Sequence, residues 1–123
     1  MANPLKPIKG RPMDRKSARF STRLPIQYYV KGVVLDIGFK DAVTTDLSST
    51  GLSFENNKPI REGSIIEIKI FMPGYKKPIQ VTGKVIRTDR YTNMFVVAVA
   101  FEKINPVDKE KINFWYYKDT LKL

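Results

Sequence analysis

Two arginines, Arg15 and Arg19, stand four residues apart in the segment RKSAR, just before the first stretch of sequence with the apolar residues of a folded core. The planar guanidinium of arginine binds phosphate and the O6 and N7 atoms of guanine in a bidentate manner, and it stacks on bases. In extended chain this spacing puts both side chains on the same side, roughly 13 Å apart. The segment therefore suits a ligand with phosphates and guanine bases, although a solubilising tail has a similar composition.

A second polar motif, DLSSTG at residues 46–51, separates two β-rich stretches of sequence. The Asp46 carboxylate could accept the two N–H groups on the Watson–Crick edge of guanine, the Ser48 hydroxyl could bind a phosphate or a base edge, and Gly51 would let backbone approach a ligand closely. The same residue types build ordinary turns, in which Asp46 caps the turn, Ser48 bonds the backbone and Gly51 takes a positive φ. The motif alone leaves both interpretations open.

The positive charge of the chain is concentrated next to the first motif. The 123 residues carry 22 lysines and arginines against 12 acids, a net charge of +10, and residues 1–23 hold seven of the basic residues with one acid. Such a segment suggests an anionic partner or a solvated tail. The chain has no Cys and no His, which excludes disulfides, zinc sites of the cysteine type and Ser-His-Asp or Cys-His catalysis. We therefore predict a protein that is not an enzyme and holds no metal.

The elements that position these motifs are predicted to be mainly β-strands. Residues 1–22 contain three prolines and few large apolar residues, which is typical of a flexible arm. Beyond them, short runs rich in Val, Ile, Tyr and Phe alternate with turn residues, as in an all-β sandwich or barrel. We predict strands over the ranges 24–30, 32–37, 42–47, 51–55, 64–72, 79–90 and 93–103.

The C-terminal segment predicts one helix. Asn105 fits an N-cap, Pro106 the first helical position, and Asp108 the first turn, where the helix dipole favours acids. The residues expected to form its apolar, core-facing stripe are Val107, Ile112, Trp115 and Tyr116. No apolar run is long enough to span a membrane, and the N-terminus lacks the apolar region of a signal peptide, so we expect a cytoplasmic location.

The order of the two motifs is more specific than either motif alone. RxxxR precedes the first predicted strand, Leu24-Pro25 follows, DxSxxG begins 27 positions after Arg19, and GLSF opens the next strand. This arrangement resembles the PilZ domain, the bacterial receptor module for the second messenger cyclic di-GMP. The resemblance covers essentially the folded chain, including the late hairpin QVTGKVIRTDR…FVVAVAFEKINP and the helix after it.

The resemblance implies a fold, a ligand and a set of binding residues. The fold would be a six-stranded antiparallel split β-barrel with a C-terminal helix over residues 23–123, preceded by a flexible basic arm over 1–22 that carries the RxxxR loop; the predicted strand 32–37 would then merge with a neighbour. Cyclic di-GMP would be gripped between arm and barrel, ordering the arm and changing a surface read by an unidentified downstream protein, with no DNA, RNA or membrane span expected. The implied ligand-binding residues are Arg15, Arg19, Asp46, Ser48 and Gly51.

The chain departs from the family pattern at one point and leaves other functions open. Many PilZ domains have consecutive arginines where this chain has Arg15-Lys16, and lysine supplies charge without the planar fork. Lys16 and Arg11 could add contacts, Arg87 could face the site or solvent, and the site could hold one ligand molecule or an intercalated pair. The alternatives are a small basic nucleic-acid-binding barrel and a PilZ-fold protein that acts only through protein contacts.

Overall fold

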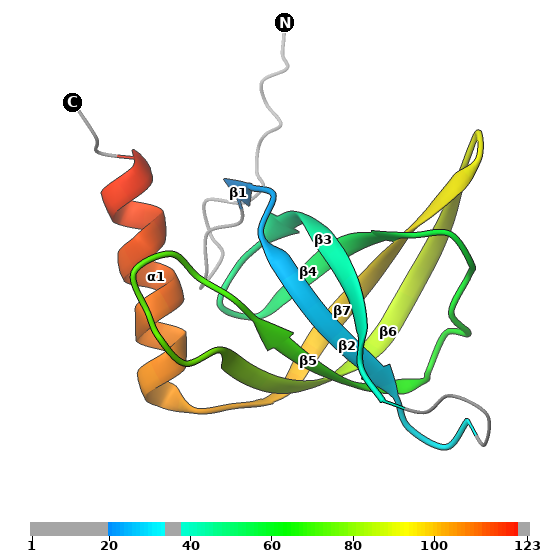
Figure 1. Cartoon of the computed structure of the whole chain (residues 1–123), viewed down its shortest axis with the longest axis horizontal. Coiled ribbons are helices and arrows are strands. Elements are labelled where there is room, and N and C mark those ends of the chain that lie inside the picture. Colours follow the sequence, from blue (N-terminus) through cyan, green and yellow to red (C-terminus); the bar gives the residue numbers. More distant parts are fainter. Residues whose placement is uncertain (1–19, 34–37, 121–123) are drawn as a thin grey trace, which may run out of the picture.

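Seven β-strands and one C-terminal helix make up the part of the chain that the computed structural model describes, residues 20–33 and 38–120 (Figure 1). Most of the predicted strands are confirmed, but Gly32 lies in a turn after the first long strand with a φ of 83°, so the range 32–37 does not begin a strand. Residues 34–37, and the predicted arm up to residue 19, lie outside the described residues. The elements are β1 (Phe20–Ser21), β2 (Pro25–Val30), β3 (Lys40–Leu47), β4 (Gly51–Asn56), β5 (Ile65–Ile70), β6 (Ile79–Tyr91), β7 (Met94–Ile104) and α1 (Pro106–Thr120).

Six of the strands close into an antiparallel barrel, as the sequence predicts. Their order is β3-β2-β5-β6-β7-β4, and β4 pairs back with β3 to complete the ring. The short β1 pairs with the last residues of β3, which lie beyond the part of β3 that β2 covers. Closure gives each long strand two hydrogen-bonded neighbours, so the barrel has no long free edge among the described strands.

Alternate strand positions fill the barrel interior. In β5, Ile66, Ile68 and Ile70 are buried, whereas Glu67 and Lys69 between them are partly exposed. This period of two is what a strand with one core-facing side requires. The core also receives Phe54 from β4 and, from the helix, Ile112, which is fully buried.

The helix begins as predicted, but its predicted apolar stripe is only partly right. The Asn105 Oδ1 atom accepts a hydrogen bond of 2.8 Å from the Val107 N–H, and Pro106 is the first helical residue. Ile112 is buried and Trp115 packs against the core, whereas Val107 is 62% exposed. Val107 precedes Ile112 by five residues, which turns it about 140° away from the core-facing side of the helix.

Gly83 generates a prediction about how closely β6 and β7 pack. It lies at a bulge in their pairing, where an added Cβ would overlap Val99 Cγ1 and lie 2.9 Å from the carbonyl oxygen of Ala100. We expect Gly83→Ala to lower the free energy of unfolding by about 1–3 kcal/mol, the usual cost of overpacking. Urea denaturation measures this, with Lys84→Ala at the exposed next position as the control. If Gly83→Ala and Lys84→Ala unfolded at the same urea concentration, β6 and β7 could move apart without loss of stability, and the prediction would be wrong.

Candidate functional site

The strand β1 attaches the segment that follows RxxxR to the point where DxSxxG begins. Phe20 is paired with Leu47, and Ser21 with Asp46. Arg19 is the covalent neighbour of Phe20, so the chain enters the barrel beside the second motif. The four basic site candidates, Arg11, Arg15, Lys16 and Arg19, themselves lie outside the described residues.

Asp46 lies on the outside of the barrel, one residue past a bulge in β3. The pairing of β3 with β4 shifts register between Thr44 and Asp46, and Asp46 is paired with Ser53. Its neighbour Leu47 is fully buried in the core. Since successive side chains of a strand point to opposite faces, the carboxylate of Asp46 faces outward, on the surface that β1 approaches. Bulges of this kind commonly redirect a side chain next to a binding site.

Ser48 holds the turn between β3 and β4. Its Oγ atom accepts a 3.1 Å hydrogen bond from the Thr50 N–H and donates to the Gly51 carbonyl at 3.3 Å, while its own N–H donates to the same carbonyl at 2.8 Å. The side chain is 1% exposed. The expected bonding of Ser48 to the backbone is therefore confirmed.

The expectation that Gly51 takes a positive φ is wrong. Among the described glycines, positive φ values occur at Gly32, Gly38, Gly63 and Gly74. Gly51 is instead the first residue of β4, buried and paired with Ala100 of β7.

A row of cross-strand partners runs from β1 to β6 and ends at Arg87. Starting from Asp46, the row passes through the short side chains of Ser53 and Ala98, which is paired with Arg87. The Arg87 Nε donates to Asp89 Oδ2 at 2.7 Å. This hydrogen bond and the charge of Asp89 raise the pKa of Arg87 above its ordinary value, and the more distant Asp46 carboxylate acts in the same direction. Arg87 is thus a surface residue within electrostatic reach of Asp46.

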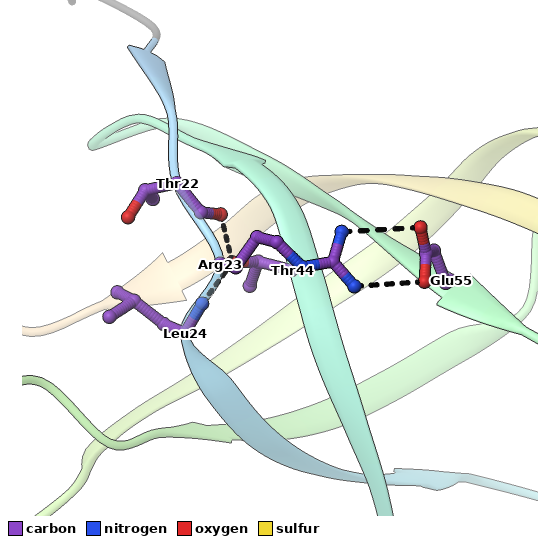
Figure 2. Close-up of polar contacts among 5 residues, drawn as sticks. All are labelled: Thr22, Arg23, Leu24, Thr44 and Glu55. Carbon is purple, nitrogen blue, oxygen red and sulfur yellow. Dashed lines mark hydrogen bonds and ion pairs between the residues drawn. The ribbon is translucent and has the colours of Figure 1, made fainter.

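Thr44 fastens the chain between β1 and β2 to the barrel, and sequence reasoning missed it. Figure 2 shows its hydroxyl between two backbone groups: it donates to the Thr22 carbonyl at 2.6 Å and accepts from the Leu24 N–H at 2.8 Å. The backbone N–H of Thr44 also donates to the Leu24 carbonyl at 2.9 Å. Because Thr44 is fully buried, these bonds have no competition from water.

Arg23 holds the same segment from outside through Glu55 of β4. Two parallel hydrogen bonds of 3.1 and 3.3 Å join its guanidinium to the two carboxylate oxygens (Figure 2). The Arg23 side chain is 61% exposed, so the ion pair adds little to the free energy of unfolding. Its main effect is to position the segment that carries Arg23. Hydrogen bonding to Arg23 holds the pKa of the Glu55 carboxyl below its ordinary value. Arg23, the last of the seven basic residues in the range 1–23, is therefore engaged by the barrel.

Two features bear on metal binding and membrane crossing in the described part of the chain. Residues 20–33 and 38–120 contain no group of three or more Asp or Glu side chains placed to hold a metal ion. In the same residues, no helix combines the length and the apolar character needed to cross a membrane.

Comparison with known proteins identifies the family. The PilZ domain matches the sequence over residues 13–118, a range that includes both motifs, the barrel and most of α1. The chain belongs to the PilZ domain family. A search of curated proteins gives no match.

Solved structures similar to this PilZ protein share its fold at low sequence identity. The Bacillus subtilis inhibitor of motility MotI/DgrA has a TM-score of 0.75 and 14% identity, over 96% of this chain and 56% of that one. The PilZ domain of YcgR from Escherichia coli, with c-di-GMP, has a TM-score of 0.64 and 16% identity, over 89% and 99% of the two chains. The K. pneumoniae MrkH–c-di-GMP complex has a TM-score of 0.59 and 14% identity, over 88% and 53%. This PilZ chain thus spans little more than half the length of MotI/DgrA.

The hydrogen bonds of the Thr44 hydroxyl predict that removing this hydroxyl lowers the free energy of unfolding. Thr44→Val keeps the side-chain shape but leaves the buried Leu24 N–H without its acceptor. We expect a loss of about 1–3 kcal/mol in the free energy of unfolding and faster hydrogen exchange at the Leu24 amide. Thr45→Val makes the same chemical change at a partly exposed neighbour. Unchanged Leu24 exchange in Thr44→Val would contradict the anchor.

The contact between Arg23 and Glu55 predicts how the pKa of the Glu55 carboxyl responds to substitution of Arg23. The Glu55 carboxyl should titrate below its ordinary pKa of 4.5 and return toward that value in Arg23→Gln. Since the folded-state pKa is the lower one, the stability that the pair contributes is present above about pH 4.5 and is lost as the pH falls through the folded-state pKa. NMR titration of the carboxyl measures this. Lys31→Gln, which removes the partner of Glu67, is the control and should leave the Glu55 pKa unchanged.

Proposed function

We propose that this protein is a non-enzymatic receptor for cyclic di-GMP. Membership of the PilZ domain family supports the proposal, and two fold relatives, the YcgR domain and MrkH, have structures with c-di-GMP. The pairing of Phe20 and Ser21 with Leu47 and Asp46 carries the proposal for the site. It brings the two residues that follow RxxxR beside the first two residues of DxSxxG, so the two motifs can bind one ligand from opposite sides.

The residues of the two motifs have complementary roles in this proposal. Arg15 and Arg19 bind phosphates and guanine edges through their planar forks, while Lys16 and Arg11 add positive charge. The carboxylate of Asp46 accepts the N–H groups of a guanine.

The β3–β4 turn shapes the opposite side of the proposed site. Ser48 is buried and acts through its bonds to Thr50 and Gly51, which set the shape of the turn. Gly51 leaves the backbone of β4 without a side chain beside the ligand.

Ligand binding in this proposal orders the arm against the barrel. Ordering costs conformational entropy, which contacts made only in the bound state must offset. The anchors at Thr44 and Arg23 already fix residues 22–24, so the cost is confined to residues before β1. The ordered arm then presents a changed surface to a downstream protein.

A calorimetric titration with cyclic di-GMP tests the proposal. We expect saturable binding by the unmodified protein and about 10- to 100-fold weaker binding by Arg19→Ala and by Asp46→Ala, because each loses charge-assisted hydrogen bonds. Arg61→Ala, an exposed arginine in the β4–β5 connection, is the control and should bind unchanged. The stoichiometry distinguishes one ligand molecule from an intercalated pair.

Parallel titrations with GTP and a single-stranded oligonucleotide separate the alternatives. Cyclic di-GMP binding that is equal in all variants would overturn the site. No heat with cyclic di-GMP, together with salt-sensitive oligonucleotide binding, would overturn the ligand and favour a nucleic-acid-binding barrel. No binding of cyclic di-GMP, GTP or the oligonucleotide would favour a protein that acts only through protein contacts.

A further inference from the structure

A cavity of about 720 Å³ lies between the end of β2, the start of β3 and the connection from β4 to β5. Figure 1 shows these segments meeting at the end of the barrel away from α1. The DxSxxG segment joins the end of β3 to the start of β4, so it lies at the other end. The cavity is therefore separate from the proposed cyclic di-GMP site, and its volume falls within the range of about 300–1,000 Å³ that is usual for small-molecule sites.

Part of the cavity wall is apolar and deeply set. Tyr28, Val30 and Ile60 line the cavity, and these side chains are only 5%, 7% and 8% exposed. Insertion into a membrane needs apolar side chains that protrude from the surface. A recessed apolar wall instead suits the apolar part of a small molecule that enters the cavity.

Hydrogen bonds hold this wall in one shape. The Tyr28 hydroxyl donates to Asn56 Oδ1 at 2.9 Å, and Asn56 Nδ2 donates to the Lys58 carbonyl at 2.7 Å. Further along the connection, the Ile60 carbonyl accepts a 2.7 Å hydrogen bond from the Thr88 hydroxyl. The cavity is thus formed by contacts within the protein, so a ligand does not have to order its wall on binding.

The charged side chains among the described residues that line the cavity are all cations: Lys40, Lys58 and Arg61. Lys40 is the cross-strand partner of Tyr28, so its side chain leaves the sheet on the same face as the Tyr28 ring. Lys58 and Arg61 are exposed residues of the β4–β5 connection. Three cations beside an apolar wall create a positive potential that attracts an anion and does not favour a neutral molecule of the same shape.

We propose that this cavity binds a small amphipathic organic anion, of which a medium-chain carboxylate is the simplest example. The hydrocarbon part lies against the apolar wall, where it leaves water. The carboxylate lies among the three cations, which select for its charge. This second site does not depend on the binding of cyclic di-GMP at the other end of the barrel.

Titration of the full chain with octanoate, followed by calorimetry and by NMR, tests the proposal. We expect saturable binding that is about tenfold or more tighter than that of octan-1-ol, which lacks the charge, and of acetate, which lacks the chain. The amide signals that shift should be those of Tyr28, Val30 and the β4–β5 connection. Octanoate that does not bind, that binds no better than octan-1-ol, or that shifts signals elsewhere would overturn the proposal.

Variants that remove one charge each separate the role of the cations from general attraction by a basic protein. Lys58→Gln and Arg61→Gln should each weaken octanoate binding about 3- to 10-fold and leave octan-1-ol binding unchanged. Lys76→Gln makes the same charge change in the β5–β6 connection, at the other end of the barrel, and should bind octanoate like the unmodified protein. Equal weakening in all three variants would overturn the assignment of the anion to this cavity.

A last titration with octanoate in saturating cyclic di-GMP tests whether the two sites are separate. We expect the octanoate affinity to stay within about twofold, because the ligands would bind at opposite ends of the barrel. Displacement of octanoate by cyclic di-GMP would overturn the second site. The octanoate titrations of the protein alone give their result even if cyclic di-GMP does not bind, so the failure of one proposal is distinguishable from the failure of the other.

Discussion

The pairing of β3 with β4 closes the barrel, and the candidate site depends on that closure. Without it, the six strands would form an open sheet with two long edges. The connection across the closure is the DxSxxG segment itself. Its serine holds the turn, its glycine starts β4 against β7, and the bulge before Asp46 adjusts the register where the strands meet. The motif therefore forms the turn and also belongs to the candidate site. For this reason the sequence alone could not distinguish a turn motif from a binding motif.

Residues 20–24 are held to the barrel by contacts within the described chain. Thr44 satisfies two backbone groups there inside the barrel wall, and the Arg23–Glu55 pair crosses to β4 on the surface. Both contacts use groups of the barrel itself, so they exist without any ligand. Because β1 is already held in place, a ligand that bound the arginines before it would not lose binding free energy in positioning β1.

Sequence patterns predicted the parts of this structure that depend on local periodicity or on motif order. The alternation in β5 and the Asn105 cap are properties of a few consecutive residues, and the order of RxxxR and DxSxxG identified the family. Contacts between distant residues were not predictable: Arg23 and Glu55 are 32 positions apart, and Thr44 looks like any β-branched strand residue. Val107 was misplaced because apolar residues on both faces of α1 remove the single stripe by which a core-facing side is recognised.

The distribution of charge along the chain agrees with cyclic di-GMP as the small ligand proposed above. Residues 20–123 carry 16 basic residues against 11 acids, so their excess of positive charge is small for their length. Residues 1–19, by contrast, contain six basic residues and one acid in sequence, including both arginines of RxxxR. A nucleic acid needs a continuous basic groove along which successive phosphates are neutralised. A small ligand with two phosphates needs positive charge at one place only, and the chain brings the end of its most basic segment to Asp46.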